Sequence, residues 1–275
     1  MAKLDCRHQV RFELSEHPRL ILIPHNRKNH YLEIPTSCVD KIPIAHQYTL
    51  MSYPWCFMWA PEQPGKERAA ALTAATWPAG TSIGISFLDG IPSVQDRVKT
   101  AAMQWLTRTG IHLDFNWLND PEAGTIRISF SRKGSWSVLG KYAEQVPKGE
   151  PTMNFGWLNK HSSDLAVREV VLHEFGHALG LIHEHQNPDG GIQWNEEKVI
   201  ESLSGPPNNW SEEKIRRNVL DHYTAHKIHG TPFDMNSIML YPFPAEWTTN
   251  TNGTRNNTDL SDMDISLVQE LYQSN

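Results

Sequence analysis

Alternating apolar and polar positions recur through the middle of the chain, and they predict β-strands. The segment TSIGISFLDG alternates and ends in Asp-Gly, as a strand running into a turn does. The segments IHLDFNW and TIRISF alternate in the same way, and GSWSVLGK and PTMNFGW are two further strand candidates. We therefore expect five strands in this part of the chain.

Apolar residues at helical spacing predict two long helices. Ser93 would cap the first, whose apolar face comprises Val94, Val98, Ala101, Ala102 and Trp105. Asp164 would cap the second, which should stop near Gly180 and whose apolar residues are Leu165, Val167, Val170, Val171 and Leu172. Further helices are expected at SEEKIRRNVLDHY and, capped by Ser261, at SDMDISLVQELY. This order predicts an α+β fold in which a helix backs a mixed five-stranded sheet.

Proline and glycine divide the chain into three parts. Residues 1–60 carry short apolar bursts broken by prolines and would form an N-terminal extension. The polar stretch APEQPGKE leads into a linker that we place at residues 61–76. Residues 77–275 would form the main domain, with an upper subdomain at 77–180 and a mostly irregular lower subdomain at 181–275 that ends in a helix. A chain of 275 residues is long enough for one such domain with an extension.

Composition and charge exclude several classes of partner. Hydrophobic residues make up 39% of the chain and the net charge is −6, which argues against a nucleic-acid partner that needs a basic face. No apolar run approaches the length of a membrane span, and charges interrupt the first residues, MAKLDCRHQVRFEL, so we expect no signal peptide. The three cysteines Cys6, Cys38 and Cys56 lie within the first 56 residues of the chain, and an odd number cannot pair completely within it.

Four histidines and two glutamates crowd into the segment VLHEFGHALGLIHEHQNPDG. Residues four apart share one side of a helix, so His173 and His177 point both imidazoles at one position, and Glu174 lies about 100° around the axis beside it. His183 would lie about 240° from His177 in a continuous helix and joins only if the helix ends between them. Gly180 accepts the left-handed conformation that ends a helix, so the spacing allows three histidines to converge.

Three neutral imidazoles suit zinc and leave a fourth position open for water, as a catalytic zinc site requires. Bound zinc lowers the pKa of its water to roughly 7, and Glu174 would accept that proton and pass it to the leaving amine. The alternative is an amphipathic helix whose histidines face solvent. All five fixed positions of HExxHxxGxxH arise by chance in roughly one such chain in ten thousand, so we predict one zinc ion. No loop shows a recognisable spacing of calcium ligands.

The complete motif resembles that of the metzincin zinc endopeptidases, a clan that also carries a later methionine turn. Met239, in NSIMLYPF, lies 56 residues after His183 (239 − 183). Glu184 follows the third histidine and SIMLY is similar to the SxMHY of the astacin family, so the chain resembles the astacins over about residues 77–275. Leu240 stands where that family usually has histidine, and this part of the chain lacks the family's cysteines.

The resemblance implies a metzincin-like fold and roles for further residues. Tyr241 would be a movable additional zinc ligand that hydrogen-bonds the oxyanion in the transition state. Gly180, Glu184 and Met239 would be structural at the site, with Glu184 contacting the amino terminus of the mature enzyme after a cleavage before Trp77. GSWSVLG resembles the cleft-edge strand of the family, so a substrate would add as a strand alongside Trp136, Ser137, Val138, Leu139 and Gly140.

The N-terminal extension is interpreted as a prosegment that fills the cleft and keeps the zinc site latent. A thiolate is a good zinc ligand and would displace the catalytic water. Cys56, in YPWCFMW, is the cysteine nearest to the catalytic part, and Asp40 is an alternative ligand of the kind found in some astacin-like precursors. The competing interpretation is that the cysteines are buried or unpaired structural thiols.

The favoured function is a zinc-dependent endopeptidase that hydrolyses internal bonds of protein or peptide substrates, acts as a monomer and uses Glu174 as general base. The first alternative is a non-catalytic zinc-containing binding protein, against which Glu174 argues because such a module needs no general base. The second is a hydrolase of non-peptide amides. The resemblance favours export from the cell, whereas the expected lack of a signal peptide and of cysteines in the catalytic part does not. His185 has no role in this hypothesis.

Overall fold

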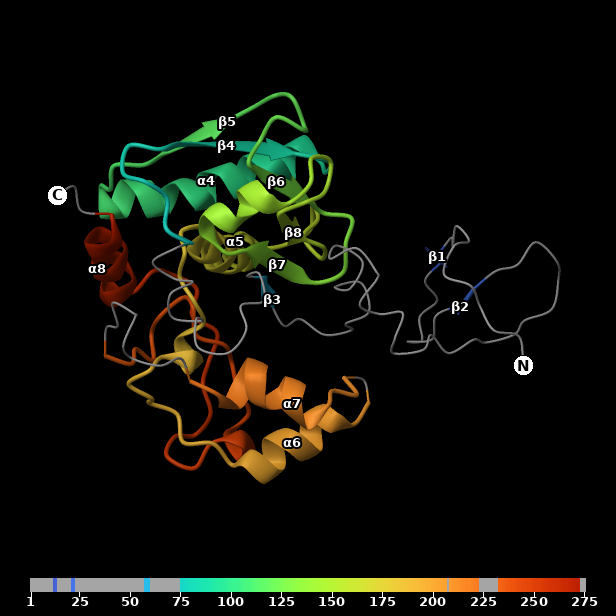
Figure 1. The fold of residues 1–275 in the computed structure, drawn as a ribbon, viewed down its shortest axis with the longest axis vertical. Helices are drawn as coiled ribbons and strands as arrows, with labels where there is room; N and C mark the ends of the chain where they lie inside the picture. The colour runs from blue at the N-terminus through green and yellow to red at the C-terminus, as the bar shows by residue number, and fades with distance from the viewer. Residues whose placement is uncertain are drawn as a thin grey trace. The chain divides into compact units, whose positions relative to one another are not determined.

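The computed structural model describes residues 12–13, 21–22, 57–59, 75–206, 208–222 and 232–272, which Figure 1 shows as a ribbon. The chain divides into two compact units, Met1–Ser52 and Tyr53–Asn275. In the first unit, the described residues form β1 (Phe12–Glu13) and β2 (Ile21–Leu22), which pair antiparallel. All other described elements belong to the second unit.

One sheet of order β3-β7-β8-β6-β4-β5 organises the second unit. Its strands are β3 (Phe57–Trp59), β4 (Ser82–Phe87), β5 (Asp114–Trp117), β6 (Ile126–Ser129), β7 (Ser135–Val138) and β8 (Met153–Phe155). Strand β7 pairs antiparallel with β8, and the other pairs are parallel. The five strands β4 to β8 confirm the predicted mixed sheet of an α+β fold, and β3 adds a sixth strand from the preceding segment.

The two predicted long helices are α4 (Pro92–Thr109) and α5 (Asp164–Ala178), which pack against each other beside the sheet (Figure 1). The cap predicted at Ser93 is wrong, because α4 already begins at Pro92, whose missing N–H suits the first turn of a helix. The cap predicted at Asp164 is also wrong, because the Ser163 hydroxyl accepts the capping hydrogen bond instead.

The remaining helices lie mostly after the histidine motif at residues 173–183. They are α6 (Glu196–Ser204), α7 (Glu212–Ile215) with the π-turn η4 (Arg216–Leu220), α8 (Asp262–Leu271) and the short turns η2 (Gly140–Gln145), η3 (Glu184–Gln186) and η6 (Ala245–Trp247). Helix α6 lies in a stretch that was expected to be irregular. Ser261 caps α8 as predicted, in a complete capping box with Asp264. Within the described ranges, no helix combines the length and the apolar character that a membrane span needs.

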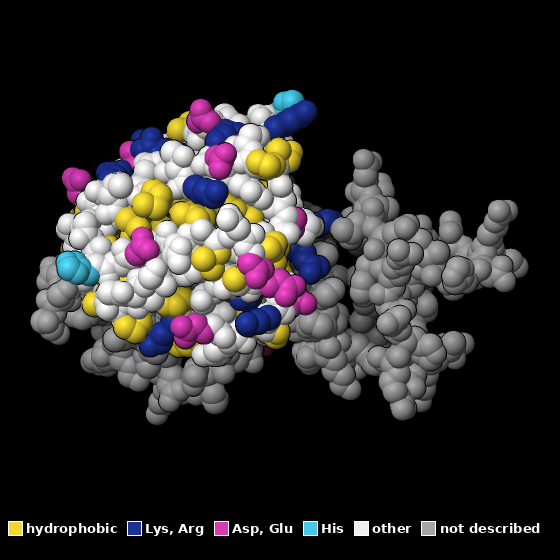
Figure 2. Space-filling model, turned by 90° about the horizontal axis from the view of Figure 1, so that it is seen from above, with side chains coloured by type: hydrophobic (Ala, Val, Ile, Leu, Met, Phe, Trp, Pro, Cys, Tyr) yellow, Lys and Arg dark blue, Asp and Glu magenta, His cyan; other side chains and the backbone are white. Residues whose placement is uncertain are grey.

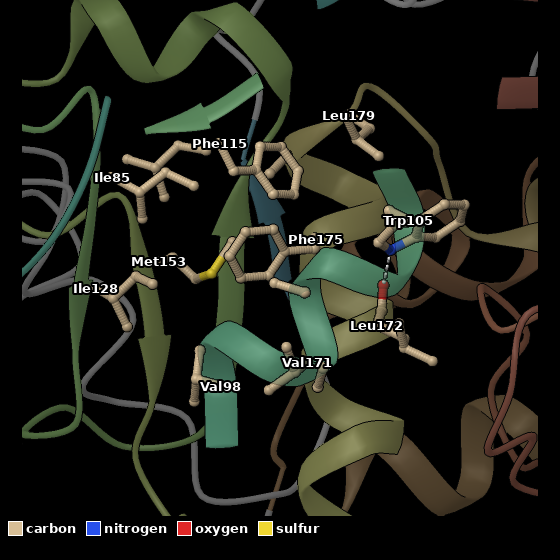
Figure 3. Close-up of a cluster of buried hydrophobic side chains, with 14 of the residues drawn as sticks. Ile85, Val98, Trp105, Phe115, Ile128, Met153, Val171, Leu172, Phe175 and Leu179 are labelled. Atoms are coloured by element: carbon tan, nitrogen blue, oxygen red, sulfur yellow. Dashed lines mark hydrogen bonds between the residues drawn. The ribbon is translucent and has the colours of Figure 1, made fainter. Parts of the chain in front are cut away.

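The main hydrophobic core lies between the sheet and the helices α4 and α5, and Figure 3 shows its centre. The rings of Phe115 and Phe175 meet there, with 5.4 Å between their centroids, and the Trp105 indole Nε1 donates a hydrogen bond of 2.9 Å to the Leu172 carbonyl. Burying one such large apolar side chain contributes about 1.5–3 kcal/mol. The apolar face of α5 therefore fixes the helix that carries the histidine motif onto the sheet.

A second, smaller core fills the region after the motif and includes side chains of α6, α7 and η6. Its buried members are Ile192, Val199, Leu203, Trp210, Ile215, Val219, Leu220, Leu240, Phe243 and Trp247. Ile238 and Met239 belong to the main core, whereas Leu240 belongs to the second. The chain therefore passes from one core to the other between Met239 and Leu240, and the leucine fills apolar space.

The molecular face seen in Figure 2 carries Lys and Arg side chains interspersed with Asp and Glu side chains. Ion pairs such as Arg97 with Asp164 at 2.7 Å and Lys99 with Asp96 at 3.5 Å occur in the described part of the chain. Among the described residues of this face, the mixture forms no continuous basic stripe of the kind that binds nucleic acid.

We predict that Gly176→Ala destabilises the protein, although alanine normally favours a helix interior by about 1 kcal/mol. A Cβ at Gly176 would overlap the Met239 sulfur and lie 3.3 Å from Trp105 Cζ2 in the main core, and overpacking of this kind costs about 1–3 kcal/mol. Chemical denaturation of the two proteins measures the difference. In a Met239→Ala background the same glycine change should become neutral or stabilising, and stabilisation by Gly176→Ala alone would contradict the packing.

Candidate metal centre

Helix α5 positions the first two predicted ligands and then ends. His173 and His177 lie one turn apart on its buried side, with 4.9 Å between their ring centroids. The helix ends at Ala178, Leu179 is its C-terminal cap, and Gly180 adopts a positive φ of 95°. Because side chains with a Cβ disfavour this left-handed region, the glycine provides the bend that the sequence predicted.

Two distant side chains satisfy the carbonyls that the end of α5 leaves exposed. Trp77 Nε1 donates a hydrogen bond of 2.7 Å to Ala178 O, and Tyr272 Oη donates one of 2.7 Å to Leu179 O. Carbonyls at a helix C-terminus have no partner inside the helix and need one elsewhere. Trp77 precedes the strand β4 and Tyr272 follows α8, so both ends of the main domain hold the bend.

His183 completes the cluster after the bend. Its Nε2 lies 3.1 Å from His177 Nε2, and one ring nitrogen from each of His173, His177 and His183 lies within 4.8 Å of the others. Nitrogen ligands of a tetrahedral zinc ion lie about 3.3 Å apart, given Zn–N bonds of about 2.0–2.1 Å. His173 Nε2 is buried and accepts no hydrogen bond within the described residues, so its lone pair remains available. The three side chains therefore fit a zinc ion.

Backbone carbonyls set the tautomer of two of these histidines. His173 Nδ1 bonds Ile238 O at 2.8 Å, and His177 Nδ1 bonds Leu181 O at 2.8 Å. A carbonyl oxygen only accepts, so in each ring Nδ1 carries the proton and donates it. The lone pair then resides on Nε2, which is the atom that each ring offers to the metal.

Burial keeps the three histidines neutral. Burial lowers the pKa of His173 to about 4. It also lowers the pKa values of His177 and His183 well below the ordinary value of 6.5, and the neighbouring histidines lower these two further. Because metal binding requires deprotonated imidazole, the folded chain presents its ligands in the binding form at neutral pH.

The two predicted catalytic residues border the cluster. Glu174 follows His173 on α5 and is only 1% exposed. The ring centroid of Tyr241 lies 4.6 Å from that of His183 and 5.3 Å from that of His173. The Thr254 hydroxyl donates a hydrogen bond to the backbone oxygen of Tyr241. This bond fixes the backbone at Tyr241, from which the phenol projects.

Glu184 connects the end of the motif to the methionine turn. Its backbone N–H donates to Met239 O at 3.0 Å, and its carboxylate Oε1 accepts hydrogen bonds from Asn187 Nδ2 at 3.0 Å and Asp234 N at 2.8 Å. Burial raises the pKa of Glu184 to about 7 despite these donors. The contact predicted between Glu184 and a mature amino terminus stays a prediction.

His185 has a structural place that the sequence did not reveal. It is 1% exposed, its ring stacks on His183 with 5.4 Å between centroids, and Trp194 and Phe243 meet it edge-on. His185 Nε2 donates to Asn218 O at 3.1 Å. Helical periodicity could not place His185, because His185 lies in the separate turn η3 after the bend and does not continue the helix α5.

The segment predicted to bind substrate contains the strand β7, which is already paired with β3. Strand β7 includes Trp136, Ser137 and Val138, and Leu139 and Gly140 follow it. Strand β3 pairs along β7 in parallel, in the register Phe57↔Trp136, Met58↔Ser137 and Trp59↔Val138. Strand β3 therefore occupies the edge of β7 in this chain, and the addition of a substrate strand along Trp136 to Gly140 stays a prediction. The latency ligands considered from the sequence, Cys56 and Asp40, lie outside the described residues.

Comparisons with known proteins agree on one family. The model of the astacin peptidase family matches residues 70–273. A structure of myroilysin is similar with a TM-score of 0.69 and 36% identity, covering 74% of this chain and 97% of that one. A crystal structure of myroilysin has a TM-score of 0.59 and 33% identity, covering 80% of this chain and 91% of that one. None of the curated proteins matches the chain significantly.

We predict that zinc binding at about pH 6 releases far fewer protons than three exposed histidines would. With the ordinary pKa near 6.5, about three quarters of such rings are protonated at that pH, and binding would release about two protons. The lowered pKa values leave the folded, metal-free rings neutral instead. Calorimetric titration in two buffers of different ionisation enthalpy counts the protons, and release of about two would contradict the burial.

The same shifts fix the sign of the pH dependence of stability. Histidines whose folded pKa is lowered bind fewer protons in the folded state than in the unfolded state below pH 6.5. The metal-free chain should therefore lose stability as the pH falls from about 6.5 toward about 4, the folded-state pKa of His173.

Proposed function

Because the chain belongs to the astacin family and is a zinc metalloendopeptidase, we propose that it hydrolyses internal bonds of protein substrates with one zinc ion held by His173, His177 and His183. The observation that carries the ligand assignment is the convergence of these three buried side chains within 4.8 Å. The three histidines come from both sides of the bend at Gly180. The cluster therefore depends on the contacts of Trp77 and Tyr272 that hold this bend.

When bound, zinc would polarise the scissile carbonyl and lower the pKa of a water molecule. Glu174 is the general base in this proposal: its carboxylate takes the proton from the attacking water and later gives it to the leaving amine. Its burial beside His173 supports the role, since the low-dielectric surroundings strengthen its interactions with charge. A protein that only binds zinc would not need a carboxylate at this position.

Tyr241 would donate a hydrogen bond from its phenol to the oxyanion that develops during attack, and would be an additional ligand in the resting state. Its ring already lies against the rings of His173 and His183. A donor that is positioned before the reaction stabilises developing negative charge without reorganisation.

The intact chain would be latent, with residues before Ala75 acting as a prosegment. An extended substrate would add to the edge of β7, and β3 occupies that edge. Ala75 is fully buried with its carbonyl against Gly140, and Trp77 N–H donates to Tyr272 Oη at 3.3 Å. Since the chain from Ala75 onward is part of the fold, an activating cleavage would fall before it.

We predict that Glu174→Gln abolishes cleavage of denatured casein or gelatin, lowering the rate about 100- to 10,000-fold, because the general base is lost. The variant should still bind one zinc ion, measured by metal analysis after dialysis. Glu169→Gln makes the same chemical change on the same helix and should leave the rate unchanged. Chelator should stop the wild-type reaction, and added zinc should restore it.

Three outcomes would contradict the assignment. Full activity of Glu174→Gln would remove Glu174 as the base. A wild-type protein that binds zinc but cleaves no protein, before or after removal of its first residues, would favour the non-catalytic alternative, and cleavage confined to small non-peptide amides would favour the other.

We predict that Cys56→Ala raises the activity of the intact chain, because a thiolate that displaces the catalytic water would be lost. Cys38→Ala is the matched control and should leave the activity as it is. Removal of the residues before Ala75 should raise the activity further, since β3 then leaves the edge of β7. Rates of gelatin cleavage by equal amounts of intact protein measure the effect. An unchanged rate in Cys56→Ala would eliminate the Cys56 thiolate, leaving Asp40 or β3 to account for latency.

A further inference from the structure

A chain of hydrogen bonds leads away from His173 on the side opposite to the metal position. His173 Nδ1–H donates to Ile238 O at 2.8 Å. The next peptide N–H, that of Met239, donates to Ser237 Oγ at 3.0 Å, and Ser237 Oγ–H donates to Asp264 Oδ1 at 2.7 Å. The chain therefore begins at an imidazole of α5 and ends at a carboxylate of α8.

All three donors point the same way. The Ile238 carbonyl and the Met239 N–H belong to one peptide group, so the bond at one end of that group polarises the bond at the other. The hydroxyl of Ser237 accepts from the peptide and donates to the carboxylate at the same time. Hydrogen bonds connected in this sense strengthen one another.

The carboxylate at the end of the chain is well held. Asp264 is 4% exposed, and its second oxygen, Oδ2, accepts hydrogen bonds from Ile238 N at 2.8 Å and Ser261 N at 2.9 Å. Burial raises the pKa of Asp264 above its ordinary value, and the three donated hydrogen bonds oppose that rise because they favour the ionised form. Both carboxyl oxygens of Asp264 accept hydrogen bonds. The Asp264 carboxylate therefore lies behind the peptide segment whose Ile238 carbonyl accepts the hydrogen bond from His173.

We propose that Asp264 is a positioning residue for His173 that acts through Ser237 and the Ile238–Met239 peptide. It would orient the imidazole and increase its electron donation to the metal, as a carboxylate bonded directly to a metal-ligating histidine does. This inference rests on the proposed function, because His173 must be a zinc ligand. It gives the closing helix α8 a part in the metal centre, although α8 supplies no ligand.

The second histidine of α5 lacks an equivalent long-range contact at Nδ1. His177 Nδ1 donates to Leu181 O, only four residues away in the same bend. His173 is linked instead to a residue 91 positions later in the chain (264 − 173). Loss of the chain should therefore affect His173 selectively.

Zinc affinity of the full chain tests the proposal, measured by competition with a chromophoric chelator at neutral pH. We expect Ser237→Ala and Asp264→Asn each to weaken zinc binding about tenfold, at the lower end of the range for residues that orient metal ligands. Ser237→Ala keeps both hydrogen bonds of Oδ2, so it tests the chain even where Asp264→Asn disturbs folding. The double variant should lose little more than either single one, because both changes interrupt one path.

Ser261→Ala is the matched control. The Ser261 hydroxyl accepts the capping hydrogen bond from Asp264 N, so this variant weakens α8 and leaves the chain to His173 intact. It should lower the unfolding temperature of the metal-free protein but keep its zinc affinity within about twofold of wild type, because the carboxylate still accepts from Ser237.

A spectroscopic signature separates polarisation from general loosening. In zinc-loaded protein labelled with ¹⁵N-histidine, the Nδ1 proton of His173 should move upfield in Ser237→Ala and Asp264→Asn, whereas that of His177 should stay in place. Unchanged zinc affinity and an unchanged His173 resonance in both variants would overturn the proposal, as would an equal affinity loss in Ser261→Ala. Failure of wild-type protein to bind zinc would instead overturn the proposed function.

Discussion

Three imidazoles can share one ion in this chain only because helix α5 stops one residue after its second ligand. Gly180 turns the backbone, and the carbonyls that the helix then leaves exposed are taken up by Trp77 and Tyr272. The bend is therefore fixed by side chains from the first and last described segments of the main domain. The distance of 3.1 Å between His183 Nε2 and His177 Nε2 depends on this helix end.

The segment from Ser237 to Leu240 links the metal centre to the rest of the fold. One of its carbonyls accepts the proton of His173, one of its side chains packs under α5 at Gly176, and its backbone is bonded to Asp264. It also connects the two hydrophobic cores. Burial accounts for the well-defined conformation of this segment. Polar groups removed from water must form hydrogen bonds inside the protein, and each such bond restricts the conformation of the backbone.

The amino-acid pattern predicted the elements of the sheet well and their ends less well. Alternation identified β4, β5 and β6, and the further candidates GSWSVLGK and PTMNFGW became β7 and β8. It did not reveal that β6, β7 and β8 are buried at every position, because burial of both faces depends on segments that are distant in sequence. Ser93 and Asp164 were assigned as caps because several residues near each helix start can cap, and local sequence does not choose among them. The ligands followed from the spacing around Gly180. The places of His185 and Asp264 could not, because both depend on contacts between segments far apart in sequence.

If substrate adds to the edge of β7, as proposed, the pairing of β3 with β7 makes substrate binding a competition between a strand of the same chain and a free peptide. Because β3 belongs to the same chain as the edge that it covers, it is present at that edge at a high effective concentration. A peptide in solution must exceed that concentration or bind much more tightly to displace it. One cut in the chain between β3 and Ala75 would make this competition bimolecular, so β3 would leave by dilution even though none of its contacts had changed.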